Sequence, residues 1–217
     1  HEVKRLSSEG VREFNLIAQD SSFYGRDLND GTTLARLLKE LVKIDNVKWI
    51  RLFYLYPTYF DDELLEIITK EEKICKYVDI PLQHISDSVL RRMHRRDSSQ
   101  SIKKLLKKLR NTTPYITIRT TLMVGFPGET EADFKELLTF IKAVKFDNMG
   151  AFTYSAQDGT PAARMVDQVT EEIKENRYHE LMAAQAEISE ENNRNLIGVD
   201  TEVLVEELLD DGCGNLQ

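Results

Sequence analysis

Apolar residues recur along the chain in two alternating patterns, which short polar turns separate. Five short segments are rich in β-branched and aromatic residues and several are apolar on both faces, as in strands covered by helices. These segments span residues 14–19, 49–56, 77–82, 116–124 and 149–154. Between them, leucine and isoleucine recur at three- and four-residue steps, typical of helices, over residues 33–44, 61–73, 88–94, 100–110, 131–144 and 171–196. This alternation predicts an α/β fold, a partial TIM-like parallel barrel.

The two ends of the chain depart from this repeating pattern. Residues 3–8 resemble the end of a helix that Gly10 stops, and in a series of βα units that helix needs a preceding strand. Since the sequence begins at His1, we expect the first βα unit of the barrel to lie upstream. Gly198 closes the last helix, and residues 201–208 take up a strand-like pattern. We predict an incomplete barrel over residues 1–198 and the beginning of a small β module over residues 199–217.

The composition of the chain restricts the cellular compartment and the kinds of partner that we expect for it. The 217 residues carry a formal net charge of -8, so the chain as a whole lacks the positive charge of a nucleic-acid binder. The sequence contains neither an apolar run long enough to span a membrane nor a secretory signal. Its two cysteines, Cys75 and Cys213, cannot form a dense disulfide framework, which fits a reducing compartment. We predict a cytoplasmic protein with no membrane partner.

Two basic segments are local exceptions to the acidic composition. Four arginines surround Met93 and His94 between residues 91 and 96, and a lysine-rich segment runs from Lys103 to Arg110. The lysine pattern favours a solvated helix face over a binding patch. The arginines fit a solvated surface and an anion-contacting surface equally well.

The segment from residue 122 to residue 130, which joins a strand to a helix, is a candidate ligand site. In parallel α/β folds, the loops at the carboxyl ends of the strands form the active site. Gly125 leaves room for a ligand against the backbone, and Gly128 permits a positive φ. Thr130 and Asp133 form a variant capping box that starts the next helix. The alternative is an ordinary strand-to-helix connection.

Other predicted strand ends are polar and converge on the same edge of the sheet. Gln19 ends the first strand, Gln83 and His84 follow the third, and Tyr154 ends the last. Arg119 lies within the fourth strand, where its charge requires a carboxylate partner from the protein or from a ligand. Each of these residues alone is typical of a structural role, whereas together they favour a binding site.

Several common catalytic motifs are absent from the sequence. It contains no P-loop lysine motif, no Gly-x-Gly-x-x-Gly fingerprint, no Gly-x-Ser-x-Gly elbow and no His-Glu-x-x-His helix. Phosphate-loop, dinucleotide-binding, serine-hydrolase and zinc-protease functions therefore lose support.

Three segments of the chain form a distinctive set of motifs. The segments are 81–95 (Pro-Leu-Gln-His-Ile-Ser-Asp through Leu-Arg-Arg-Met-His-Arg), 119–130 (containing Val-Gly-Phe-Pro-Gly-Glu-Thr) and 152–162 (Phe-Thr-Tyr-Ser-Ala-Gln-Asp-Gly-Thr-Pro-Ala). Together they resemble one family, the radical S-adenosylmethionine (SAM) methylthiotransferases. Their order and spacing resemble the family over nearly the entire chain. The first predicted strand end, with Tyr24 and Gly25 after it, resembles the type that modifies an aspartate of small-subunit ribosomal protein twelve. The alternatives are the type that modifies adenosine in tRNA and a catalytically inert barrel fragment.

The resemblance implies SAM and two 4Fe-4S clusters as cofactors. Each cluster needs three cysteines, which Cys75 and Cys213 cannot supply, so we expect the chain by itself to be inactive. The implied reaction begins with reductive cleavage of SAM to a deoxyadenosyl radical, which takes hydrogen from the aspartate β-carbon before a methylthio group is inserted. The implied partners are the ribosomal protein or the small ribosomal subunit and an electron donor such as flavodoxin. Nucleic acid could contact the TRAM domain that would follow the barrel.

The resemblance also implies roles for particular residues. Gly125 and Phe126, with Phe152 and Tyr154, would lie along the adenine of SAM. Gln83 and Ser86 would lie near the ribose, Arg119 would bind the methionine carboxylate, and Gln19 would face the reacting centre. No metal ligand is assigned within the chain.

Overall fold

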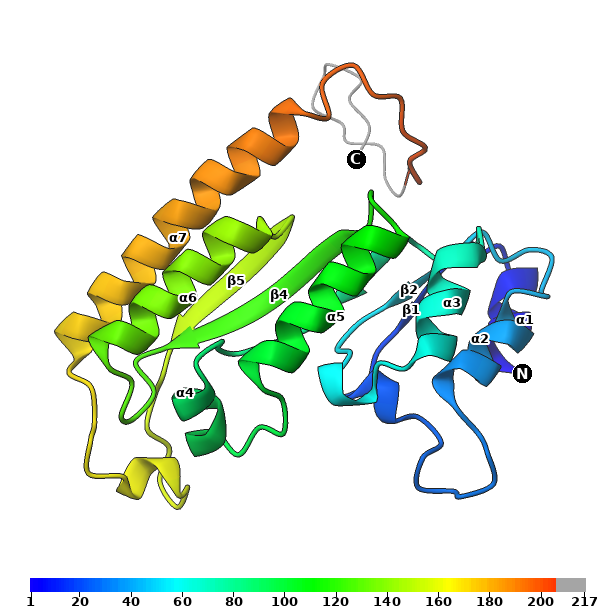
Figure 1. Cartoon of the computed structure of the whole chain (residues 1–217). Helices are drawn as coiled ribbons and strands as arrows, with labels where there is room; N and C mark the ends of the chain where they lie inside the picture. Colours follow the sequence, from blue (N-terminus) through cyan, green and yellow to red (C-terminus); the bar gives the residue numbers. More distant parts are fainter. Residues whose placement is uncertain (206–217) are drawn as a thin grey trace.

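A curved layer of parallel strands runs through residues 1–205, the part of the chain that this computed structural model describes (Figure 1). The strands are β1 (Glu13–Leu16), β2 (Trp49–Leu52), β3 (Tyr77–Asp79), β4 (Thr117–Val124) and β5 (Asn148–Thr153). The α-helices are α1 (Glu2–Ser8), α2 (Leu34–Leu41), α3 (Asp62–Lys70), α4 (Asp87–Arg92), α5 (Ser99–Thr112), α6 (Glu131–Val144) and α7 (Glu171–Arg194). Short 3-10 helices are η1 (Ser21–Phe23), η2 (Pro57–Tyr59) and η3 (Ala162–Arg164).

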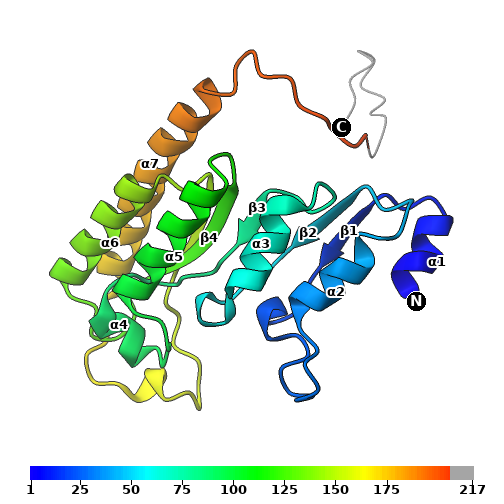
Figure 2. The same cartoon turned by 45° about the vertical axis from the view of Figure 1, so that its right-hand side comes forward.

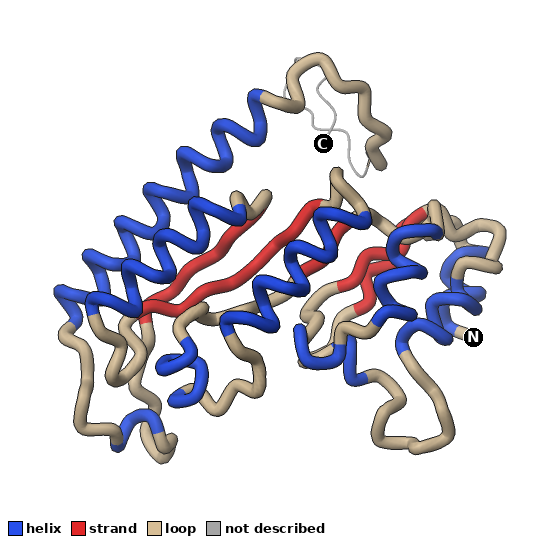
Figure 3. The backbone as a smooth tube through the Cα atoms, in the orientation of Figure 1, coloured by secondary structure: helices blue, strands red, loops and turns tan. Residues whose placement is uncertain are grey.

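The strands follow sequence order across the layer. β1 pairs with β2, and β4 lies between β3 and β5, with every pair parallel. A parallel bridge between Ile50 and Ile74 joins the two sets, as does a 2.8 Å hydrogen bond from the Leu55 N–H to the Asp79 carbonyl oxygen. Figure 3 shows the two sets of strands with helices along one side. The predicted parallel α/β fold is confirmed.

The two faces of the strand layer differ in polarity, as β4 shows. Ile118, Leu122 and Val124 are buried beneath the helices, which lie on one face of the layer (Figures 1 and 2). Arg119 and Thr121 alternate with them and are half-buried on the opposite face. β4 is therefore not one of the strands that are apolar on both faces, in keeping with the polar Arg119 in its sequence. Within residues 1–205 that opposite face is the inner side of an open arc, where polar side chains keep contact with solvent.

Three predicted strands extend at least three residues past the observed ends, and left-handed backbone explains one of these ends. The predicted strand at 49–56 ends at Leu52, two residues before Tyr54, whose φ of 55° a strand cannot continue through. The predicted strand at 77–82 ends at Asp79, although Gln83, with φ of 68°, still forms a parallel bridge to Leu122. β1 ends at Leu16, and the Asp20 side chain instead accepts the Ser22 N–H at 3.0 Å to start η1.

The carboxyl-terminal segment does not test the predicted β module. Helix α7 ends close to its predicted boundary, and residues 199–205 carry neither helix nor strand. The predicted strand-like segment at 201–208 extends outside the described residues, and so does Cys213. The division at residue 198 stays a prediction. Within residues 1–205, no helix combines the length and apolar character needed to cross a membrane.

Candidate functional site

The turn after β4 is held by glycine conformations and by close contacts from other elements. Gly125 and Gly128 have φ of 75° and 81°, as the turn prediction required for Gly128. A Cβ atom at Gly125 would lie 2.3 Å from Cγ of Lys174, a buried side chain of α7. The space against the Gly125 Cα is thus filled by Lys174 rather than left open for a ligand. The predicted capping box is confirmed, because Thr130 and Asp133 exchange side-chain and backbone hydrogen bonds.

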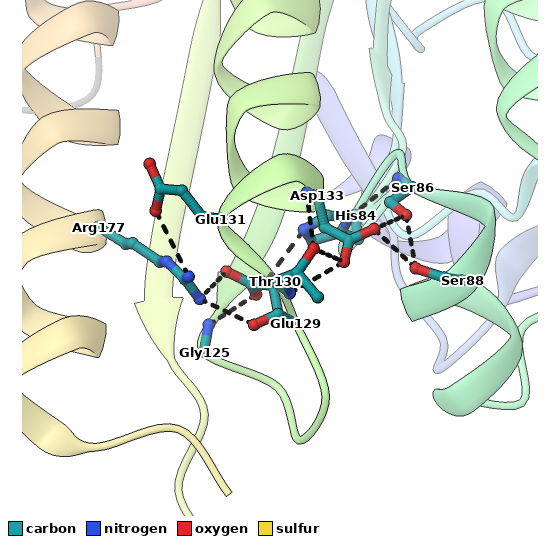
Figure 4. A network of polar contacts seen from close by, with 9 residues as sticks. All are labelled: His84, Ser86, Ser88, Gly125, Glu129, Thr130, Glu131, Asp133 and Arg177. Atoms are coloured by element: carbon teal, nitrogen blue, oxygen red, sulfur yellow. Dashed lines mark hydrogen bonds and ion pairs between the residues drawn. The ribbon is translucent and has the colours of Figure 1, made fainter. Parts of the chain in front are cut away.

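Glu129 is the centre of a buried polar network below this turn (Figure 4). One carboxylate oxygen accepts the Gly125 N–H at 2.7 Å, and the other accepts Nη1 of Arg177 at 2.9 Å. Burial raises the pKa of Glu129, while Arg177 and the backbone N–H groups oppose that shift. The network therefore ties the turn to α7 through a buried ion pair.

His84, from the segment after β3, faces the same carboxylate. Its Nδ1 accepts the Ser86 backbone N–H at 2.9 Å, which places the proton of the neutral ring on Nε2. Nε2 lies 3.7 Å from the Glu129 carboxylate oxygen, too far for a hydrogen bond. Burial lowers the pKa of His84 to about 4, so the ring is neutral at pH 7.

Asp133 links the His84 segment to the start of α6 (Figure 4). Its carboxylate accepts hydrogen bonds from the hydroxyls of Ser86, Ser88 and Thr130. Burial disfavours the charged form, but these hydrogen bonds outweigh it and hold the pKa of Asp133 well below its usual range. The Ser86 hydroxyl is consequently engaged with Asp133.

Two adjoining pockets lie at the carboxyl ends of the strands. The first, of about 350 Å³, is here called the Phe126 pocket, and Met93, Met123 and Met165 also line it. The second, of about 280 Å³, is the Gln19 pocket, which Tyr54 and Thr121 also line. Both pockets share three lining residues, namely Tyr56, Gln83 and Arg95. A sulfur- and aromatic-lined compartment therefore adjoins a more polar one.

Gln83 lies on the boundary of the two pockets in a strained conformation. Its φ of 68° is rare for a residue with a side chain and costs on the order of 1–3 kcal/mol. Its backbone still pairs with β4, since its N–H donates to Thr121 O at 2.9 Å and its carbonyl accepts the Met123 N–H at 2.8 Å. Such strain at a pocket wall is typical of a binding residue.

Arg95 also lies on that boundary and forms no ion pair with any residue between 1 and 205. Its guanidinium lies 4.2 Å from the centre of the Tyr56 ring, and Nη2 donates to Pro81 O at 2.8 Å. The Nε atom is buried without a hydrogen-bond partner, and within residues 1–205 no carboxylate lies within ion-pair distance. Burial lowers the pKa of Arg95, while the ionisable groups of Tyr56, Asp97 and Asp20 oppose that shift. A guanidinium in this setting can bind an anionic ligand group.

Arg119 has the carboxylate partner that its position in β4 predicted. Its Nη1 lies 3.0 Å from Oδ2 of Asp79, a fully buried residue of the neighbouring strand. Burial raises the pKa of Asp79, and Arg119 opposes that shift. The protein itself thus supplies the partner for Arg119.

The predicted site residues lie in three places. Gln19, Gln83 and Phe126 line the two pockets. Tyr154 packs edge-on against Phe126, with ring centres 5.2 Å apart, and its hydroxyl is buried without a partner. The remaining predicted residues, which do not line either pocket, are Ser86, Arg119, Gly125 and Phe152.

Sequence reasoning missed the individual importance of Arg95 and Tyr56. Arg95 was one of four arginines in a basic segment, and nothing in the local pattern separates it from Arg91, Arg92 or Arg96. Its position directly after a short helix that follows the polar strand end at Gln83 was a usable signal, since chain close to a strand end contributes to the pocket.

No three Cys, His, Asp or Glu side chains within residues 1–205 form a group that could hold a metal ion. The described residues therefore do not provide a ligand set for an iron–sulfur cluster. By contrast, an aromatic and methionine-lined pocket beside a guanidinium that has no ion-pair partner within residues 1–205 fits SAM, which has an adenine at one end and a carboxylate at the other.

Comparison with known proteins decides the family. The model of the Radical SAM superfamily matches residues 1–141. The chain belongs to the radical SAM superfamily. Two solved radical SAM structures show the same fold at 16% sequence identity. Coproporphyrinogen III oxidase (HemN) from Escherichia coli covers 86% of this chain and 44% of its own, with a TM-score of 0.65. The methyltransferase TsrM from Kitasatospora setae covers 75% and 29%, with a TM-score of 0.58.

Several similar curated relatives are named methylthiotransferases. The chain is 52% identical over 205 residues to the protein named ribosomal protein uS12 methylthiotransferase RimO from Pelobacter propionicus, and 53% identical to that of Citrifermentans bemidjiense. Each match covers 94% of this chain and 46% of the relative. The chain thus spans about half the length of these relatives. The resemblance inferred from the sequence is confirmed.

Proposed function

We propose that this chain forms the SAM-binding barrel portion of a radical SAM methylthiotransferase that modifies an aspartate of small-subunit ribosomal protein uS12. The observation that carries the proposal is the Phe126 pocket joined to the Gln19 pocket at Arg95. The similar relatives named RimO support the choice of substrate. SAM, when bound, supplies the radical chemistry of the superfamily.

The adenine end of SAM would lie in the Phe126 pocket. Phe126 packs against Tyr154 there. The family resemblance also places Gly125 and the exposed Phe152 along the adenine, but neither lines this pocket, so a contact from them requires SAM to extend beyond it. Gln83 would contact the ribose from the pocket boundary. A ribose contact from Ser86 would have to compete with the hydrogen bond that its hydroxyl donates to Asp133.

The carboxylate end of SAM has two candidate partners. Arg119 is the partner that the family resemblance implies, but its guanidinium already pairs with Asp79. Arg95 lies on the pocket boundary with no carboxylate partner among residues 1–205. We therefore propose that Arg95 makes the stronger contact. Gln19, which lines the adjoining pocket, would face the reacting centre and help to exclude water.

The two 4Fe-4S clusters belong to the proposal through the family alone. Each cluster would need three cysteines, whereas this chain has two in total, so we propose that the ligands come from other parts of the full-length protein. The chain by itself should then bind no iron in stoichiometric amount and should not cleave SAM. Cytoplasmic location, an electron donor such as flavodoxin and nucleic-acid contact through a following β module remain parts of the proposal.

A substrate panel tests the proposed function. Reconstituted full-length enzyme would be incubated separately with isolated uS12, with small ribosomal subunits and with tRNA, and products analysed by mass spectrometry. We expect a methylthio group on an aspartate of uS12. Methylthiolation of tRNA alone would replace this proposal with the tRNA-modifying alternative, and no product on any substrate would favour the inert barrel.

A further inference from the structure

A groove between α5 and α6 lies away from the two pockets described above. The two helices lie side by side over the same face of the strands in both views (Figures 1 and 2). The groove has a volume of about 600 Å³. Its apolar lining consists of Leu106 from α5 and of Phe140, Ala143 and Val144 from α6.

The α5 side of this groove carries a row of cations. Lys103, Lys107 and Arg110 lie at i, i+4 and i+7, so they share one helix face with Leu106. α5 contains no Asp or Glu, although the chain as a whole has a net charge of -8. This wall is therefore a basic stripe on an acidic protein, which the lysine-rich pattern alone did not distinguish from a solvated face.

Existing ion pairs leave part of this charge available. Arg110 is held by Asp147 at 2.7 Å, and Lys103 reaches across the groove to Glu136 at 3.7 Å. Lys107 forms no ion pair with any residue between 1 and 205. Lys135 adds a fourth cation from α6, where it pairs with Glu131 at 3.4 Å, and Glu136 is the single acidic residue that lines the groove. The lining is thus apolar at its base and net positive at its rim.

We propose that this groove binds an acidic amphipathic helix of a partner protein. The groove lining runs over residues 103–110 of α5 and 135–144 of α6, roughly 12–15 Å of helix at 1.5 Å per residue, enough for about two to three helical turns of a partner. An apolar stripe on the partner would cover the exposed Ala143 and the half-buried Val144, above the buried Phe140, and acidic side chains on one flank would face α5. A nucleic-acid backbone would match the cations but not the apolar base, so the protein partner is favoured.

Peptide binding to the full-length protein tests this proposal. The probe is a fluorescein-labelled 14-residue helical peptide with leucines in one stripe and glutamates on one flank, and its control has the same composition in scrambled order. Fluorescence anisotropy should show the patterned peptide binding at least about tenfold more tightly than the scrambled one. Equal binding, or binding of neither peptide, would overturn the proposal, including the case in which another part of the protein fills the groove.

Paired variants locate the contact. The double variant Lys103→Glu with Lys107→Glu should lower the affinity for the patterned peptide by about tenfold, because attraction to the α5 side of the groove becomes repulsion. Ala143→Arg, at an exposed position in the groove lining, should also weaken it. The matched control is Lys104→Glu with Lys108→Glu, which changes the same charge on the same helix outside the groove. Equal loss in both double variants would indicate nonspecific attraction and overturn the proposal, as would binding of duplex RNA in the groove without peptide binding.

Discussion

Two neighbouring regions at the carboxyl ends of β3 and β4 differ in whether their buried polar groups are paired. Below the turn at residues 125–129, the Glu129 carboxylate is paired with Arg177, and Asp133 is held by three hydroxyls. In the adjoining pockets, Arg95 is partly buried, and no carboxylate among residues 1–205 lies within ion-pair distance of it. Gln83 there has a strained backbone conformation.

This difference indicates that one region mainly stabilises the fold and the other mainly binds the ligand. A paired buried charge is costly to break, because its partner remains buried and unpaired. A partly buried charge without a partner contributes little to stability, but it is ready to bind an anion that replaces the missing partner. We therefore expect the network around Glu129 to control folding and the boundary at Arg95 to control ligand affinity.

The largest expected effect comes from Arg177→Met. Removing this guanidinium leaves Glu129 buried with only backbone donors, which should lower the free energy of unfolding by about 3–5 kcal/mol. Urea denaturation measures the loss. The double variant Glu129→Gln with Arg177→Met should lose less than the sum of the two single variants, because the two side chains act as a pair. Additive losses would contradict the buried ion pair.

The pH dependence of stability should reveal His84. Its pKa in the folded protein is about 4, below the value of about 6.5 expected in the unfolded chain. The unfolded state therefore binds more protons between these values, so stability is complete above pH 6.5 and falls as the pH drops toward 4, by about 3 kcal/mol in all. Urea denaturation of the wild type and His84→Asn across this range should show a smaller slope in the variant. Parallel curves would contradict the buried neutral ring.

Local parts of this site could be predicted from the sequence, and long-range parts could not. The capping box at Thr130 and Asp133 depends on residues three apart, so the pattern was sufficient. The need of Arg119 for a carboxylate followed from its place in a strand, but Asp79 is 40 residues away and nothing local identified it. The pairing of Glu129 with Arg177 spans 48 residues and depends on how α7 packs, which no local spacing records.

The surroundings of Gly125 and the ends of the strands could not be predicted from the sequence either. Gly125 was expected to make room for a ligand, whereas the fold places Lys174 there. The predicted strands continued through apolar residues past Tyr54 and up to Gln83, where the chain turns to left-handed backbone. Side-chain polarity predicts which face is buried, but it contains little information about where backbone pairing ends.

An intermediate effect is expected for Gly125→Ala. The substitution forces a side chain into a backbone with φ of 75° and into the Lys174 side chain, which should cost about 2 kcal/mol of stability. The matched control is Gly150→Ala in β5, where a Cβ atom would meet nothing within 4 Å. Thermal or urea unfolding compares the two. Equal stability of both variants would mean that the turn adapts more easily than its contacts indicate.

The smallest effect on stability is expected for Arg95→Met. The substitution removes one hydrogen bond to Pro81 and the contact with the Tyr56 ring, but it also removes a partly buried charge, so the change in unfolding free energy should stay within about 1 kcal/mol. SAM affinity of the full-length protein, measured by calorimetry, should nevertheless fall by about tenfold or more. The control is Arg96→Met, which alters an exposed neighbour hydrogen-bonded to the Tyr59 hydroxyl and should leave SAM affinity unchanged.

Arg119→Met should show a smaller loss of SAM affinity and a larger loss of stability than Arg95→Met, because it leaves the buried Asp79 unpaired. The reverse order would assign the ligand carboxylate to Arg119 and leave Arg95 as part of the pocket wall.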